Sequence, residues 1–248
     1  MSTIVPIAFD HVLFVILAAI LPLFGWLGIR RLRKNIAAGM PYTTRIRDYR
    51  NNMLLLWSVS GAALYSWWTL GRDWSVLGIA VPGGSYGLLS LSLLLAALVV
   101  GYSYRTYRLV ERSDAVAGSV IDATRSFSFA LPHTRRDLRW FYGLSVTAGI
   151  TEELLYRGFM LVYLAAYVPV PLAIVVSSLL FAGGHAYQGR RGMLQVFMLG
   201  IVFAAIYVLS GSLLLSMLAH VLVDVFSGRA IHYAYNTPRA KAAAVEAC

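Results

Sequence analysis

The sequence predicts an all-α fold, a polytopic bundle of transmembrane helices, and three observations lead to this prediction. Hydrophobic residues make up 59% of the 248-residue chain, and the mean hydropathy is +0.69. Charged residues make up only 13%, about half the usual share in a soluble domain. The apolar residues form continuous segments, whereas the strands of a membrane barrel alternate apolar and polar residues.

Seven apolar segments follow one another along the chain. Most reach about 17–20 residues, the length that a helix needs to cross ~30 Å of hydrocarbon. Turn signals such as Pro82-Gly83-Gly84 and Ser210-Gly211-Ser212 separate several of them. We therefore predict about seven spans, with six to eight as the range. They are residues 11–29, 53–71, 84–104, 140–166, 171–187, 193–209 and 213–229.

The N-terminal part of the chain accounts for the first three spans and a long basic loop. No Lys or Arg precedes Arg30, so the first segment lacks the basic region of a cleavable signal peptide and is expected to remain in the protein. The loop 105–139 is predicted to hold interfacial helices, with Trp140 and Tyr142 as anchors at the membrane surface.

The fourth segment, residues 140–166, is too long for one straight span. It contains Gly149, Gly158 and an acidic pair between them. We expect a break or a re-entrant turn near these residues, or a helix whose first turns lie along the cytoplasmic interface. The three segments after it are predicted as ordinary spans joined by short loops.

The basic residues predict the orientation. Apart from Arg72 and Arg157, all of the 21 Lys and Arg residues lie in loops or a tail that seven spans place on one side. Positively charged loops face the cytoplasm, so the N-terminus is predicted outside and the C-terminus in the cytoplasm of a bacterial plasma (inner) membrane. The net charge of +10 is therefore a topology signal. Nucleic acid is not a predicted partner, since a basic binding face is absent from the pattern.

Ionisable residues inside the apolar segments are the candidate functional residues, because each costs about 2.5–3.5 kcal/mol near a bilayer centre. They form three clusters at helical spacing: Glu152-Glu153-x-x-x-Arg157, Phe181-x-x-x-His185 and His220-x-x-x-Asp224. The one cysteine, Cys248, is the last residue, which excludes a Cys nucleophile or a Cys-based zinc site in the apolar core. The clusters predict a functional site within the membrane.

Helical spacing divides the first cluster into two parts. Glu153 and Arg157 are separated by four residues, so they share a helix face and are predicted to form a buried ion pair that supports the bundle. Glu152 points about 100° away from Glu153 and has no local cation. It is therefore the carboxylate predicted to act as a general base toward water.

The two histidines extend the site to other helices. His185 follows two glycines that allow close helix approach. His220 lies near the middle of the last span, and Asp224 follows one turn later on the same face. Asp224 is predicted either to accept a hydrogen bond from His220 and set its tautomer, or to be a metal ligand. Phe181 is interpreted as a packing residue.

Two mechanisms fit these residues, and the sequence does not separate them. In one, a zinc ion is held by Glu152, His185 and His220 and lowers the pKa of a bound water to about 7. In the other, Glu152 and a histidine activate water without a metal, while the second histidine and Asp224 hold the oxyanion.

The order and spacing of the three motifs resemble the CPBP family, also called Abi, of CAAX proteases and bacteriocin-processing enzymes, over roughly residues 140–228. The resemblance implies an intramembrane endopeptidase, of metalloprotease or glutamate type, whose cavity opens to the cytosol. Its substrate would be a membrane-anchored protein or peptide, prenylated or not. Glu152 would activate water, His185 would help to position it, and the other motif residues would complete the site. The family's third motif often ends in Asn, where this chain has Asp224.

This interpretation divides the chain into N-terminal helices with a basic loop (1–130), a CPBP-like catalytic bundle (131–229) and a cytoplasmic tail (230–248). Two other functions remain open at this point. A non-catalytic membrane protein, such as a bacteriocin immunity or chaperone-like factor, would use the polar cluster only to hold the bundle. A proton-coupled transporter would also need buried Glu and His, but the sequence lacks detectable inverted repeats.

Overall fold

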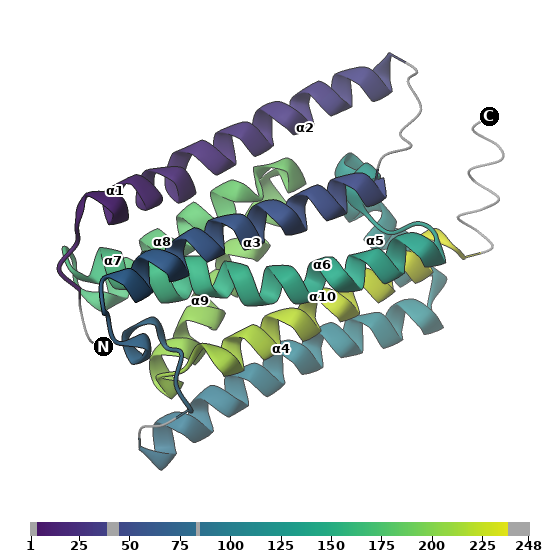
Figure 1. Cartoon of the computed structure of the whole chain (residues 1–248). Helices are drawn as coiled ribbons and strands as arrows, with labels where there is room; N and C mark the ends of the chain where they lie inside the picture. Colours follow the sequence, from purple (N-terminus) through teal and green to yellow (C-terminus); the bar gives the residue numbers. More distant parts are fainter. Residues whose placement is uncertain (1–3, 39–44, 83–84, 238–248) are drawn as a thin grey trace.

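The computed structural model describes residues 4–38, 45–82 and 85–237, and every regular element within these ranges is a helix (Figure 1). The prediction of an all-α fold is therefore confirmed. The N-terminal elements are α1 (Ala8–Val15), the π-helical η1 (Ile16–Ile20), α2 (Leu21–Ala37), α3 (Arg45–Thr69), η2 (Trp74–Leu77), α4 (Tyr86–Arg112), α5 (Asp114–Thr124) and η3 (Arg125–Ala130). The C-terminal elements are α6 (Arg135–Glu152), the π-helical η4 (Glu153–Met160), α7 (Leu161–Ala165), α8 (Val170–Gly184), η5 (Ala186–Gln188), α9 (Gly189–Ser210) and α10 (Leu213–Tyr235).

The described residues of each of the seven predicted segments are mostly helical, and the long helices lie side by side as a bundle (Figure 1). Within the described residues, four helices are long and apolar enough to cross a membrane: Ala8–Ile36, Tyr86–Arg112, Ala186–Ser210 and Leu213–Tyr235. The apolar helix α8 is shorter. This is the architecture of an integral membrane protein. The count of seven spans and the orientation stay predictions.

Two predicted boundaries differ from the structure. Helix α4 continues to Arg112, and α10 continues to Tyr235, so the predicted tail 230–248 begins as part of a helix. The loop 105–139 does contain a further helix, α5. The predicted turn residues Gly83 and Gly84 lie outside the described residues, as do residues 238–248 with Cys248.

The prediction of a break or a re-entrant turn in the fourth segment is wrong. Residues 135–165 form one continuous helical run, α6, η4 and α7, in which the widened π-helical turns of η4 begin at Glu153. The glycines instead allow close packing of neighbouring elements. A Cβ at Gly149 would lie 2.9 Å from the backbone nitrogen of Val221 in α10, and one at Gly158 would lie 3.1 Å from the carbonyl oxygen of Leu77.

Helix α6 and η4 lie at the centre of the bundle. α6 packs against α3 and α10, whereas η4 also contacts α8 and α9. All eight residues of η4 are buried. A capping box starts α6, in which the Thr134 hydroxyl accepts from the Asp137 amide and the Asp137 carboxylate accepts from the Thr134 amide. Glu153 is therefore carried on a fully buried helical segment, and Glu152 directly precedes it.

Candidate active site

The three motifs come from four elements that meet in the interior. Glu152 is the last residue of α6, and Glu153 and Arg157 belong to η4. His185 caps the C-terminal end of α8, and His220 lies in α10. Asp224 is one turn further along α10. π-Helical turns are uncommon and occur often at functional sites, and here the π-helical turns begin at the acidic pair.

Glu153 is the centre of a buried charged network. Its Oε1 lies 2.9 Å from Arg157 Nη1 and 2.9 Å from His220 Nδ1. The side chains of Glu153 and Arg157 are 0% and 1% exposed. The predicted ion pair is thus present, but it also reaches a histidine 67 residues away in the sequence. A buried carboxylate needs such partners, because an unpaired charge in the interior costs several kcal/mol.

Arg157 is enclosed by aromatic rings and a backbone carbonyl. Its guanidinium lies 4.3 Å from the ring centroid of Phe181 and 5.6 Å from that of Phe203. Nη2 donates to the carbonyl oxygen of Gly200 at 3.3 Å. Cation–π contacts of this kind gain strength when they are desolvated. Phe181 therefore packs as predicted and also contacts the buried cation.

The tautomer partner of His220 differs from the prediction. Glu153, and not Asp224, accepts the hydrogen bond at Nδ1. The reason is the close packing of α10 on α6, which brings the imidazole to η4. The other ring nitrogen, Nε2, lies 3.9 Å from Glu152 Oε2 and 3.9 Å from Asp224 Oδ2. Two carboxylates from different helices thus flank one imidazole nitrogen.

Exposure separates the supporting residues from the reachable ones. The side chain of His220 is 6% exposed, whereas those of Glu152 and Asp224 are 15% and 33% exposed. Glu153 is closed off from solvent, although its neighbour in the sequence is not. The Glu152 and Asp224 carboxylates, on either side of His220 Nε2, are therefore reachable from solvent, and His185 is partly exposed as well.

His185 lies at the rim of this group. Its Nδ1 is 3.0 Å from the Phe181 carbonyl oxygen, a contact that assigns the proton to Nδ1 because a carbonyl only accepts. An electrostatic interaction links His185 to Asp224. The same bond gives Phe181 a second role, since its backbone fixes the imidazole orientation.

Two aromatic residues near the site were not singled out from the sequence, and Gly149 has a role other than the predicted one. Phe203 stacks on His220 with ring centroids 4.8 Å apart and planes 18° apart. Tyr187 interacts electrostatically with Glu152 and Asp224, and its carbonyl accepts from Arg33 Nη2 at 2.6 Å. Gly149 allows α10 to approach α6. Tyr187 lies two residues after His185, and this position is the one signal in the sequence that could have pointed to it.

The donors suit zinc in type, but they do not gather around one point. Both histidines have Nδ1 bonded to an oxygen, and Nε2 has no hydrogen bond to any residue that the structure describes, the arrangement that zinc-binding histidines use. In the part of the chain that the structure describes, no three His, Cys, Asp or Glu side chains are placed to hold a metal ion. A zinc site at Glu152, His185 and His220 stays a prediction.

The fold and the site define an all-helical integral membrane protein with a buried Glu–Arg–His network beside two reachable carboxylates. Residues 134–226 match the family described as type II CAAX prenyl endopeptidase, Rce1-like. The segment with all three motifs therefore matches the CAAX protease family, as the resemblance predicted. No curated protein and no solved structure matches the chain significantly.

Proposed function

We propose that this protein is an intramembrane endopeptidase that hydrolyses a peptide bond of a membrane-anchored protein or peptide. The observation that carries the proposal is the placement of Glu152 and Asp224, each 3.9 Å from His220 Nε2. This distance is too long for a direct hydrogen bond and suits one bridging water. The family match of the same segment supports peptide hydrolysis as the reaction.

In the proposed reaction Glu152 is the general base. It takes a proton from water while the water oxygen attacks the scissile carbonyl carbon. The proton then passes from Glu152 to the amine nitrogen as the carbon–nitrogen bond breaks, so the same carboxylate ends the cycle ionised. Its 15% exposure allows contact with water and substrate, which the enclosed Glu153 lacks.

The other residues hold this geometry. Glu153 accepts from His220 Nδ1 and so directs Nε2 toward Glu152, while Arg157 balances the charge of Glu153. A zinc ion, if it is bound by Glu152, His185 and His220, would lower the pKa of its water. Without a metal, protonated His185 or His220 would donate from Nε2 to the oxyanion.

We infer that the bundle has seven spans and that the site faces the cytoplasm of a bacterial plasma membrane. The basic ends of α2 and α3 lie at one end of the bundle, together with the ends of α4 and α10 (Figure 1). Arg33, in the basic part of α2, contacts the Tyr187 carbonyl next to the site. Cytoplasmic ends of spans carry the basic residues, so this contact supports a cytoplasmic opening.

The test is cleavage of a membrane-anchored peptide, prenylated or acylated, by the purified protein in liposomes. We expect cleavage by the wild-type protein and none by Glu152→Gln. Cleavage that a chelator abolishes and zinc restores would assign the metal route, whereas chelator-resistant cleavage would assign the metal-free route. A folded wild-type protein that cleaves no peptide of a diverse anchored library would overturn the proposal. A phenotype in cells that Glu152→Gln leaves intact would then favour the non-catalytic alternative.

A further inference from the structure

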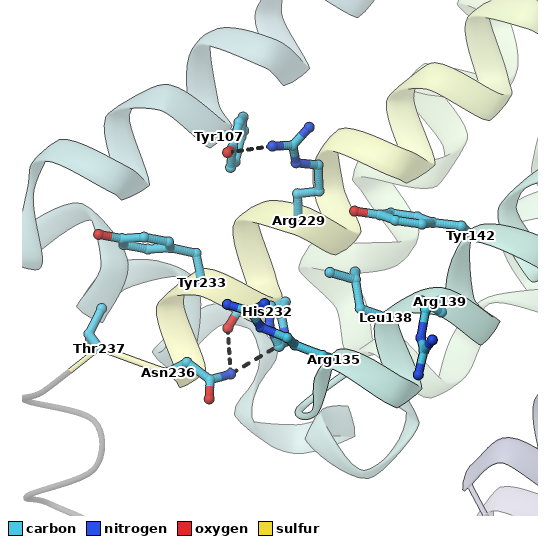
Figure 2. Close-up of a pocket in the computed structure, with 10 residues that line it drawn as sticks. All are labelled: Tyr107, Arg135, Leu138, Arg139, Tyr142, Arg229, His232, Tyr233, Asn236 and Thr237. Carbon is cyan, nitrogen blue, oxygen red and sulfur yellow. Dashed lines mark hydrogen bonds between the residues drawn. The ribbon is translucent and has the colours of Figure 1, made fainter.

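A cavity of about 950 Å³ opens at the end of the bundle, away from the motifs (Figure 2). It lies where α4 and α10 end and α6 begins. Its wall includes three arginines, one histidine and phenol groups, and none of its described residues is Asp or Glu. The residues on which the argument rests are Tyr107, Arg135, Arg139, Tyr142, Arg229 and His232.

The cavity is separate from the candidate active site, although both use α10. Arg229 follows His220 by nine residues, which turns its side chain roughly 180° around the helix axis. His220 faces η4 and Phe203 of α9, whereas Arg229 faces Tyr107 of α4. None of the six ionisable motif residues lines the cavity.

The arginines of the cavity are not neutralised by carboxylates. Arg229 Nη2 donates to the Tyr107 hydroxyl at 2.8 Å, and its guanidinium lies 4.5 Å from the Tyr107 ring centroid. The Tyr107 hydroxyl in turn donates to Glu111, which also pairs with Arg108. Arg135 and Arg139 form no ion pair or side-chain hydrogen bond with any residue that the structure describes. The wall therefore keeps a net positive charge.

The chemistry of this wall suits a phosphate group. Arginine binds phosphate through a planar fork of N–H donors, and a tyrosine hydroxyl and an imidazole add further donors. Figure 2 shows Arg229 on α10 turned toward Tyr107, with Arg135, Arg139 and Tyr142 on the neighbouring α6; all of them line the cavity. Isolated arginines on a surface would each be solvated separately, whereas three arginines here line the same cavity.

The position of the cavity indicates which kind of phosphate compound would bind there. Basic pockets between helix ends at the cytoplasmic side of a membrane bind anionic lipid headgroups. Trp140, at the start of α6, is 37% exposed, and Val146, one turn beyond Tyr142 on the same face, is 46% exposed. Trp140 thus marks the interfacial end of α6, and Val146 extends the cavity face of this helix as exposed apolar surface.

We propose that the cavity between α4, α6 and α10 binds the phosphate headgroup of an anionic phospholipid. The lipid would lie with its phosphate among the three arginines and its acyl chains along the exposed face of α6. Such a lipid would tie the ends of three helices together, so its binding would stabilise the bundle.

The test uses the full-length protein in a neutral detergent and follows its thermal unfolding midpoint during titration with phosphatidylglycerol. We expect a saturable rise, and no rise with phosphatidylcholine. Arg139→Gln should weaken the apparent affinity for phosphatidylglycerol about tenfold, since it removes one charged contact to phosphate. Arg136→Gln is the matched control, because Arg136 is an exposed neighbour outside the cavity wall, and it should titrate like the wild type.

A second variant, Arg229→Gln, checks the opposite wall and should also weaken binding. Three outcomes would overturn the proposal. Equal weakening by Arg136→Gln would show diffuse attraction to the basic end. An equal rise of the unfolding midpoint with inorganic phosphate would show that the ligand is a soluble phosphate. An unchanged lipid titration, with a raised KM of Arg139→Gln for an anchored peptide, would make the cavity a peptide site.

Discussion

At the residue scale, the adjacent carboxylates of Glu152 and Glu153 have different surroundings. A rotation of about 100° along the helix separates two neighbouring side chains. It places Glu153 between Arg157 and His220, while Glu152 stays reachable. The same substitution at the two positions should therefore have opposite consequences for activity and stability.

Glu152→Gln is expected to leave the protein folded and to lower cleavage by about 10²–10⁴-fold, because it removes the general base. Glu153→Gln should unfold the protein more easily, by about 3–5 kcal/mol, since it leaves Arg157 buried without its counter-charge. Thermal unfolding and cleavage of an anchored peptide measure both variants. An inactive but fully stable Glu153→Gln together with an active Glu152→Gln would reverse the assigned roles.

His133 lies outside the predicted spans, and its titration should make the stability of the protein depend on pH. Burial and the nearby Arg45 lower its pKa below the ordinary value of 6.5, although the Ser128 carbonyl and Asp137 oppose this. The unfolded chain therefore binds the proton more readily. The contribution of neutral His133 to the free energy of unfolding is complete above about pH 6.5. It is lost as the pH falls from there through the lower pKa of His133 in the folded protein. His133→Gln should flatten this loss in unfolding midpoints measured between pH 7.5 and 5. A variant with the wild-type slope would contradict the assignment.

At the element scale, the packing of α10 on α6 creates the site. Gly149 lies against the backbone of Val221, the residue after His220, so the absence of a side chain at Gly149 sets how closely the two helices approach. The π-helical turns of η4 then carry Glu153 to His220. A Cβ at Gly149 would meet backbone atoms, which cannot move without displacing the whole helix.

Gly149→Ala should therefore lower cleavage and destabilise the bundle by about 1–3 kcal/mol. Gly143→Ala is the control in the same helix, because its Cβ would make only an ordinary 3.7 Å contact with the sulfur of Met53. Alanine at that position should be neutral or slightly stabilising. Unfolding midpoints and cleavage rates of the two variants compare them directly. Equal behaviour of both would show that the α6–α10 distance does not control the site.

At the scale of the whole molecule, the basic residues gather at one end of the bundle, and the proposed lipid cavity lies at that end. The hydrogen bond from Arg33 to the Tyr187 carbonyl brings this basic end next to the candidate site. The proposed orientation and the proposed lipid site therefore depend on the same asymmetry of charge. The orientation can be tested without adding a new cysteine.

Cys248 is the one thiol of the chain and is predicted to lie in the cytoplasm. A membrane-impermeant maleimide should leave it unlabelled in intact cells and label it after permeabilisation. Denatured protein serves as the control for thiol reactivity. Labelling in intact cells would place the C-terminus outside and would contradict the predicted arrangement of seven spans.

Much of the fold and the local part of the site were predictable, because they depend on short-range periodicity. Continuous apolar segments predict helices, and a spacing of four residues predicts the pair of Glu153 and Arg157. One of the two roles predicted for Asp224, accepting a hydrogen bond from His220, rests on the same spacing. In the structure Glu153, 67 residues away in the sequence, accepts that hydrogen bond instead.

The sequence by itself determined the helices and the membrane class, and it predicted the resemblance to the CAAX proteases and the residues proposed to carry the chemistry. The tertiary structure alone decided that Glu153 orients His220, that Glu152 and Asp224 flank its free nitrogen, and that three arginines surround a cavity. The physical reason is distance along the chain. Helical spacing relates neighbours within a turn or two, whereas contacts between helices depend on how closely their backbones pack, here at Gly149.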